Sequence, residues 1–228
     1  GKIVLIPRLH FWTLVHLSYE LFKNRIDVLF VPSHTMPFVI PKKSLLTVHG
    51  FEALSYPEAY GMIQSLYQQF MLWHSKWLGS SYIAVSNAVK EDLKNFFVMP
   101  EERITTVYHG YERVKKSKEE RKPLVEGDYI LHIGRLEERK NQLRLIEAFE
   151  SIAQEFPKLI LVLVGGDGYR AKKIHQKVES SSFKDRIHLT GYQDEEMIYQ
   201  LLEKAKMFVY PSLAEGFGMP ILEAFDAG

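Results

Sequence analysis

The chain has no cysteine, almost no net charge and no long apolar run. None of its 228 residues is cysteine, which excludes disulfide bonds and thiolate metal sites. The formal net charge is +1, so bulk electrostatics does not draw the protein to nucleic acid. No apolar run approaches the roughly 18 residues of a membrane-spanning helix. We therefore expect a cytoplasmic protein that at most touches the inner face of a membrane, with no nucleic-acid partner.

Apolar residues, 46% of the chain, suffice for a core and fall into short runs that alternate with helical patterns. Strands alternating with helices predict an α/β fold with parallel sheets, whose ligands collect at the carboxyl ends of the strands. The expected strands are Ile3–Ile6, Val28–Phe30, Leu45–Val48, Tyr82–Val85, Ile104–Val107, Tyr129–Ile133, Leu159–Val164, Ile187–Leu189 and Met207–Val209. The expected helices cover residues 14–24, 60–77, 87–97, 142–155, 169–179 and 195–205.

A charged segment interrupts this alternation. Residues 112–127 lack apolar periodicity, so we interpret them as a solvated linker. The linker divides the chain into an amino-terminal domain of residues 1–111 and a carboxyl-terminal domain of residues 128–228.

The segment after the last expected strand combines two carboxylates, a glycine-rich turn and a helix start. It reads Glu215-Gly-Phe-Gly-Met-Pro-Ile-Leu-Glu223, and Pro220 suits the first helical position. Exposed N–H groups of Gly216, Phe217, Gly218 and the new helix favour an anion. Ionised carboxylates only accept hydrogen bonds, so they suit sugar hydroxyls. A diphosphate bonded to two sugars has both kinds of group, which predicts a nucleotide-sugar site.

The same segment resembles the E-x7-E signature of the retaining glycosyltransferases of family 4, the glycosyl transferases group 1. Further segments, which precede this one in the sequence, match the family in the order that the family uses. The resemblance covers roughly residues 26 to 228. Residues 30–60 are most like the bacterial mannosyltransferase branch. The matching pieces are Thr47-Val-His49-Gly, Ala84-Val-Ser86-Asn, Ile104–Gly110, Gly134-Arg-Leu with Lys140-Asn141, Leu161–Gly168 and Ile187–Tyr192.

The family resemblance implies the GT-B fold, in which two Rossmann-like domains with parallel sheets face each other across a cleft. Complete members are longer, so we expect both domains to be incomplete here and the chain to be truncated at both ends. Whether such a truncated chain is active stays open. The resemblance implies transfer of a hexose, with mannose favoured, from a GDP- or UDP-linked donor to a glycan or lipid-linked acceptor, with retention of configuration.

Site residues are also implied by the resemblance. Arg135 and Lys140, beside Gly134, would bind the diphosphate; the alternative is ordinary surface cations. Glu223 would accept hydrogen bonds from the ribose, and Glu215 from the transferred hexose, where it would serve catalysis. The alternative for Glu223 is a carboxylate that stabilises the helix dipole, and the alternative for Glu215 is a plain turn residue.

Three further positions are weaker candidates. His49 follows a strand, and the resemblance places it near the donor sugar as a catalytic residue; a structural histidine is the alternative. Tyr192 and Gln193 would border the base or belong to a plain loop. Residues 165–168, a glycine cluster after a strand, suggest close approach of backbone to ligand.

An aromatic stripe at helical spacing contains Phe70, Trp73, His74 and Trp77. We expect it to pack in the core, with contact to a lipid-linked acceptor or a membrane surface as the alternative. The sequence has no cluster with metal-ligand spacing and no DxD pattern, so we expect a metal-independent enzyme without a cofactor. The alternative function is a non-catalytic fragment that binds a nucleotide sugar or a partner, and the oligomeric state stays open.

Overall fold

The structure of the protein is a computed structural model that describes residues 5–6, 13–112 and 122–228. Residues 3 and 4 of the expected first strand, and residues 113–121 of the expected linker, lie outside the described residues, and Leu5 and Ile6 belong to no strand. The chain divides into two units, Gly1–His109 and Gly110–Gly228.

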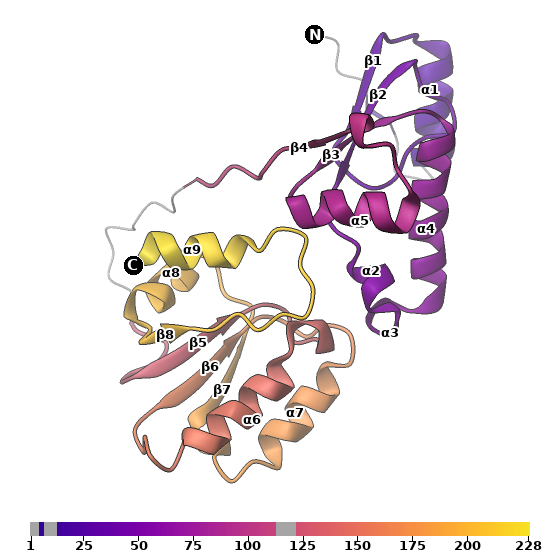
Figure 1. The fold of residues 1–228 in the computed structure, drawn as a ribbon. Coiled ribbons are helices and arrows are strands. Elements are labelled where there is room, and N and C mark those ends of the chain that lie inside the picture. Colours follow the sequence, from indigo (N-terminus) through magenta and orange to yellow (C-terminus); the bar gives the residue numbers. More distant parts are fainter. Residues whose placement is uncertain (1–4, 7–12, 113–121) are drawn as a thin grey trace. The chain divides into compact units, whose positions relative to one another are not determined.

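The first unit is built on a parallel sheet of four strands in the order β1-β2-β3-β4 (Figure 1). The last three residues of the inner strand β2, Leu46, Thr47 and Val48, are buried in succession, as expected of a parallel strand covered on both faces. The strands are β1 Val28–Val31, β2 Lys43–Val48, β3 Ser81–Ala84 and β4 Ile104–Thr106. The helices are a π-helical turn Thr13–Leu17, α1 Ser18–Lys23, α2 Glu52–Ser55, α3 Pro57–Tyr60, α4 Met62–Trp77, α5 Asn87–Phe97 and a 3-10 turn Glu101–Arg103.

Local sequence signals fix the ends of helix α5. The Ser86 hydroxyl accepts a hydrogen bond from the amide of Val89 at 3.2 Å, so Ser86 is the N-cap of the helix. At the other end Val98 adopts the left-handed conformation, with φ of 49°. The helix buries Val89, Leu93 and Phe97 on one face, in keeping with their spacing of three or four residues.

The prediction that the aromatic stripe of α4 packs in the core is wrong for its outer face. Phe70 is half exposed and Trp77 is 78% exposed. The buried residues of the helix are instead Ser65, Met71, Leu72 and Ser75. Ser75 reaches the hydroxyl of Tyr82 on β3 at 3.0 Å. The helix is anchored by this inner face, so Phe70 and Trp77 are left to solvent, whereas Trp73 packs against Phe97 with ring centroids 6.0 Å apart.

The second unit repeats the plan with the strand order β7-β6-β5-β8, all parallel. The strands are β5 Tyr129–Ile133, β6 Ile160–Val164, β7 Ile187–Gly191 and β8 Met207–Phe208. The helices are α6 Gln142–Ile152, α7 Ala171–Glu179, α8 Glu195–Lys204 and α9 Met219–Ala227, with 3-10 turns Glu138–Lys140 and Lys184–Arg186.

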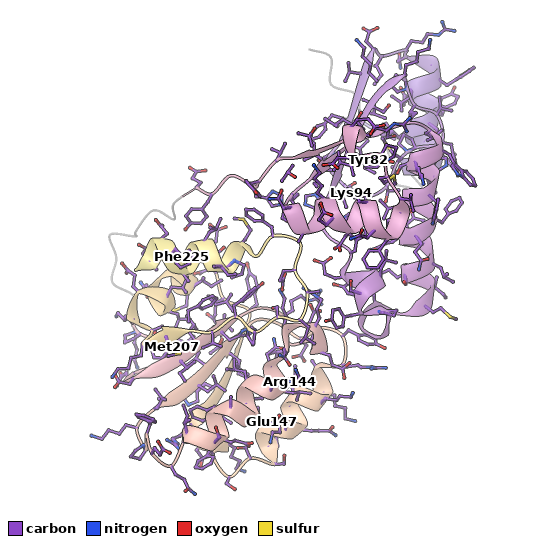
Figure 2. The ribbon with its side chains drawn as sticks, in the orientation of Figure 1. Tyr82, Lys94, Arg144, Glu147, Met207 and Phe225 are labelled. Carbon is purple, nitrogen blue, oxygen red and sulfur yellow. The ribbon has the colours of Figure 1, made fainter. Side chains whose placement is uncertain are left out.

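Two apolar layers enclose this second sheet. On one face Leu161 and Leu163 pack with residues of α6 and α7; on the other Leu131 and Val162 pack with residues of α8. Figure 1 shows α6 and α7 on one side of the sheet and α8 and α9 on the other. Figure 2 labels Phe225 on α9, which is exposed. The predicted α/β fold with two parallel sheets is therefore confirmed.

Candidate functional site

Two neighbouring strands of the second sheet, β5 and the edge strand β8, bring two distant loops together. β5 and β8 are parallel neighbours, so the loops that follow them leave the same edge of the sheet. The Asn141 side chain donates to the carbonyl of Pro211 at 3.1 Å, and the amide of Leu213 donates to the carbonyl of Arg139 at 2.9 Å. These bonds hold residues 134–141 against residues 209–218 and create the candidate site.

Lys140 and Glu215 meet directly in this site. The Lys140 ammonium donates to Glu215 Oε1 at 2.5 Å and to the hydroxyl of Tyr210 at 2.9 Å. Burial alone raises the pKa of Glu215, but the hydrogen bond from Lys140 and the charges of Lys140 and Arg139 outweigh it. The net pKa of Glu215 is therefore below its ordinary value, so the carboxylate is ionised at neutral pH.

Arg139 is a member of this site that the sequence interpretation missed. Its side chain is buried, and its guanidinium donates to Glu137 Oε1 at 2.8 Å and to the carbonyl of Ala214 at 2.8 Å. It also lies 3.0 Å from Glu215 Oε1. Together with Tyr210 these residues form what we call the Lys140 cluster: Glu137, Arg139, Lys140, Tyr210 and Glu215.

Tyr210, the other missed member, is a neutral hydrogen-bonding group. Burial first, and then the charge of Glu215, raise the pKa of Tyr210, which therefore keeps its proton. Its hydroxyl accepts from Lys140 and is hydrogen-bonded to Glu215. No sequence signal pointed to it, because 70 residues separate it from Lys140.

Arg135 also follows the carboxyl end of β5, and it is an exposed cation. Its guanidinium donates to the carbonyl of Asp167 in the turn after β6 at 3.2 Å. The amide of Gly134 donates to the carbonyl of Val164 at 2.8 Å, which joins the two turns. A Cβ on Gly165 would lie 2.2 Å from the carbonyl oxygen of Gly134. For Gly165 the structure thus supplies a reason other than a ligand: close approach of neighbouring backbone.

The turn that starts α9 carries the other expected groups. Gly218 has a φ of 88° and caps the helix, which begins at Met219 with Pro220 in its first turn. Gly216 is buried and Phe217 is half-buried. Glu223 lies one turn into α9, and burial, followed by the charge of Glu195, raises its pKa. The backbone amides at the helix start and this carboxylate thus lie on the segment that also carries Glu215.

Tyr192 and Gln193 follow β7, at the far edge of the same sheet. Tyr192 is exposed, and the Gln193 amide donates to the carbonyl of Thr190 in its own turn at 2.9 Å. Strands β6 and β5 stand between β7 and β8. Tyr192 and Gln193 therefore lie at the carboxyl ends of the strands, but at the opposite edge of the sheet from β8, whereas β5 is the neighbour of β8.

In the first unit His49 follows β2 and belongs to a row of three imidazole rings. Its Nε2 lies 2.9 Å from the carbonyl of Pro32, and because a carbonyl only accepts, Nε2 carries the hydrogen. The ring stacks on His109 at 5.3 Å and lies 5.6 Å from His34. Burial, and then the neighbouring His49, lower the pKa of His34 to about 4. The row therefore contains a neutral partner on one side of His49.

The described residues contain no group of three or more His, Cys, Asp or Glu side chains that could hold a metal ion. In the same residues no helix combines the length and the apolar character needed to cross a bilayer.

Two family models cover nearly the whole chain. The model described as glycosyl transferases group 1 matches residues 114–228. The model described as Glycosyltransferase Family 4 matches residues 3–113. The two matches meet at residues 113 and 114, close to the division of the chain after His109.

Curated relatives include two bacterial mannosyltransferases. O-antigen chain mannosyltransferase B of Escherichia coli is 28% identical over 86% of this chain and 54% of its own length. O-antigen chain mannosyltransferase RfbU of Salmonella typhimurium is 28% identical over 84% of this chain and 51% of its own. The chain thus spans about half the length of the curated relatives that it matches.

Solved structures share the fold at low identity. WaaG, a glycosyltransferase involved in lipopolysaccharide biosynthesis, superposes with a TM-score of 0.67 at 16% identity, over 92% of this chain and 60% of that one. HepE of Anabaena with UDP-glucose gives a TM-score of 0.63 at 20% identity, over 81% of this chain and 51% of that one. These neighbours are GT-B glycosyltransferases, so they confirm the fold class.

Proposed function

Because this chain belongs to the glycosyl transferases group 1 family, we propose that it acts as a hexosyltransferase in the cytoplasm. The donor is a nucleoside diphosphate sugar, GDP- or UDP-linked, and mannose is the favoured sugar because two relatives are named mannosyltransferases. The acceptor is a glycan or a lipid-linked glycan. Absence of cysteine suits a reducing compartment.

The contact between Lys140 and Glu215 is the observation that carries this proposal. It puts a buried cation and an ionised acceptor side by side at the carboxyl end of a parallel sheet. Arg135 adds an exposed cation at the same strand end, and Gly216 to Gly218 lead into a helix start. Cations and the backbone amides at a helix start suit a diphosphate, while the carboxylates suit sugar hydroxyls.

We assign the chemical roles as follows. Arg135 and Lys140 stabilise the charge that grows on the diphosphate as the bond between the sugar and its phosphate oxygen breaks. The acceptor hydroxyl oxygen bonds to the same sugar carbon on the same face, and its proton passes to the departing phosphate oxygen. Configuration is then retained, and no metal ion is required. Glu215 orients the hexose and Glu223 the ribose.

The first unit contributes His49 in this proposal. Its Nε2–H is held by Pro32, so its Nδ1 has a free lone pair to accept a hydrogen bond from a hydroxyl of the sugar or the acceptor. From the second unit Tyr192 and Gln193 are proposed to border the base. Gly134, Gly216, Phe217 and Gly218 supply backbone to the diphosphate.

Calorimetric titration with GDP, UDP and ADP, with NAD as the control, tests the donor class. We expect binding of GDP or UDP and none of NAD; the reverse result would overturn the assignment. Glu223→Ala should weaken nucleotide binding. Glu215→Gln should leave nucleotide affinity nearly intact and abolish transfer of labelled mannose. Glu138→Gln is the matched control, because Glu138 is on the same loop and pairs instead with Lys173.

The second candidate function is a non-catalytic fragment that binds a nucleotide sugar or a partner. Nucleotide binding without transfer of labelled mannose to lipid-linked or soluble glycan would select it over the enzyme.

We also propose that the outer face of α4 contacts the membrane that carries the acceptor. This face exposes Met62, Ile63, Leu66, Phe70 and Trp77. The helix has Lys76 and no acidic residue, so nothing on it repels an anionic surface. Aromatic residues beside a cation are typical of helices that lie in the membrane interface.

Sedimentation with vesicles that contain anionic phospholipid tests this contact. Trp77→Ser should reduce the bound fraction, because it removes a large apolar side chain from the proposed contact. Phe225→Ser is the matched control, since Phe225 is equally exposed, 78% like Trp77, but belongs to the second unit. Equal losses in both variants would contradict a contact specific to α4.

A further inference from the structure

A fully buried polar pair lies beneath the turn that carries Arg135. His132 is the next-to-last residue of β5, and Gln142 is the first residue of α6; both have 0% exposure. The neighbours of His132 along β5, Leu131 and Ile133, belong to the apolar core. Burying polar groups is unfavourable unless they form hydrogen bonds, so the bonds of this pair indicate what it holds.

The hydrogen bonds of the pair join three segments of the site. His132 Nδ1 lies 2.9 Å from the carbonyl of Val209, which follows β8. The Gln142 amide nitrogen lies 3.2 Å from His132 Nε2 and 2.8 Å from the carbonyl of Arg135. A carbonyl only accepts, so His132 is an Nδ1–H tautomer whose Nε2 accepts from Gln142. One amide group therefore fixes both the histidine and the Arg135 turn.

The ring of His132 also lies next to two members of the Lys140 cluster, Tyr210 and Lys140. The imidazole of His132 stacks on Tyr210 at 6.0 Å, and Tyr210 accepts from Lys140. A Cβ on Gly134 would meet His132 Nε2 at 3.3 Å and the Lys140 stem at 3.4 Å. The histidine ring and the lysine stem thus both border Gly134.

Among the described residues, the arrangement leaves one buried oxygen of Gln142 without a hydrogen bond, which costs free energy. Gln142 Oε1 is buried and accepts no hydrogen bond from the part of the chain that the structure describes. Turning the amide over would point this oxygen at the Arg135 carbonyl, so the observed orientation is the one that serves the turn. A purely apolar pair would avoid this cost but would leave the carbonyls of Arg135 and Val209 without these donors.

We propose that His132 and Gln142 are positioning residues, which hold Arg135 and Lys140 in the geometry that binds the donor diphosphate. This inference rests on the proposed function of the site. Neither side chain is accessible, so neither touches the ligand. Both act through the backbone of the Arg135 turn and through the ring of Tyr210.

Nucleotide titration of two matched variants tests the proposal in the full chain. Gln142→Met keeps the side-chain length and removes both donated hydrogen bonds. Tyr129→Phe is the control: it removes a buried hydrogen bond from the same strand, between the Tyr129 hydroxyl and the carbonyl of Leu201 at 2.8 Å. We expect Gln142→Met to weaken GDP or UDP binding about tenfold, about 1.4 kcal/mol, and Tyr129→Phe to leave it unchanged.

A double-variant comparison with Arg135 distinguishes a positioning role of Gln142 from general destabilisation of the fold. In an Arg135→Met background the further loss caused by Gln142→Met should shrink, because the two changes act on one contact. Additive losses would overturn the proposed route. If Gln142→Met does not fold, His132→Phe replaces it, since phenylalanine keeps a ring against Tyr210 and removes both polar bonds.

The outcomes for the pair and for the site are distinguishable. A wild type that binds GDP or UDP, together with variants at Gln142 and His132 that bind as tightly, overturns the positioning role alone. Equal loss of affinity in Gln142→Met and Tyr129→Phe has the same consequence. A wild type that binds neither nucleotide overturns the proposed function and the positioning role together.

Discussion

Replacing Arg139 by methionine should destabilise the second unit far more than removing an exposed cation from the same region. The Arg139 side chain is 9% exposed and holds Glu137 at 2.8 Å, Glu215 at 3.0 Å and the carbonyl of Ala214 at 2.8 Å. Methionine fills much of the space but donates nothing. Glu137, which is also buried, then lacks its observed cation.

Removing one partner of a buried ion pair typically costs about 3–5 kcal/mol. At roughly 4 °C per kcal/mol for a unit of this size, the melting temperature should fall by about 12–20 °C. Lys173→Met is the control, because Lys173 pairs with Glu138 but is 54% exposed. Exposed pairs contribute at most about 1 kcal/mol, so this variant should melt within about 4 °C of the wild type.

Scanning calorimetry measures both shifts, and a double variant checks their cause. Glu137→Gln added to Arg139→Met should restore part of the loss, since it removes the carboxylate that was left without its cation. If Arg139→Met melted like the wild type, or if Glu137→Gln made it worse, the buried network would not be what stabilises this loop.

Three further predictions concern backbone strain and pH. Gly165→Ala should cost about 3 kcal/mol in urea unfolding, because Gly165 has a φ of 145° and its new Cβ would lie 2.2 Å from the oxygen of Gly134. The affinity for GDP or UDP should fall as pH decreases, because burial raises the pKa of Glu223 and its carboxyl gains a proton at a higher pH than an ordinary glutamate does; Glu223→Gln should weaken that dependence. The first unit should lose stability as pH falls from about 6.5 to 4, because the pKa of His34 is lowered to about 4 in the folded state. The share of the loss that comes from His34 should approach about 3 kcal/mol at pH 4, and His34→Gln should remove this share in hydrogen exchange of the β2 amides.

Periodicity was enough to predict the larger elements of the fold. The apolar runs gave β5 and β6 almost to the residue, and the spacing of apolar residues gave α5. The four-residue helices α2 and α3 escaped prediction because one turn carries too little periodicity to detect. The order of strands in each sheet depends on tertiary packing, which local patterns do not encode.

The site was predicted only where a motif marked it. Lys140 and Glu215 were identified from their motifs, and the structure places them in contact. Arg139 and Tyr210 were missed, because their roles depend on partners about 70 residues away that no local pattern links. Helical spacing showed that Phe70 and Trp77 share a stripe but not which side of α4 faces the sheet.

The ion pair between Lys140 and Glu215 also links the two chemical roles of the site. An ammonium has three N–H donors, and Lys140 uses two of them on Glu215 and Tyr210. On the proposed assignment the third goes to a phosphate oxygen, so the nucleotide and the carboxylate share one cation. The hydroxyls that Glu215 orients and the departing phosphate are then held within the reach of a single lysine.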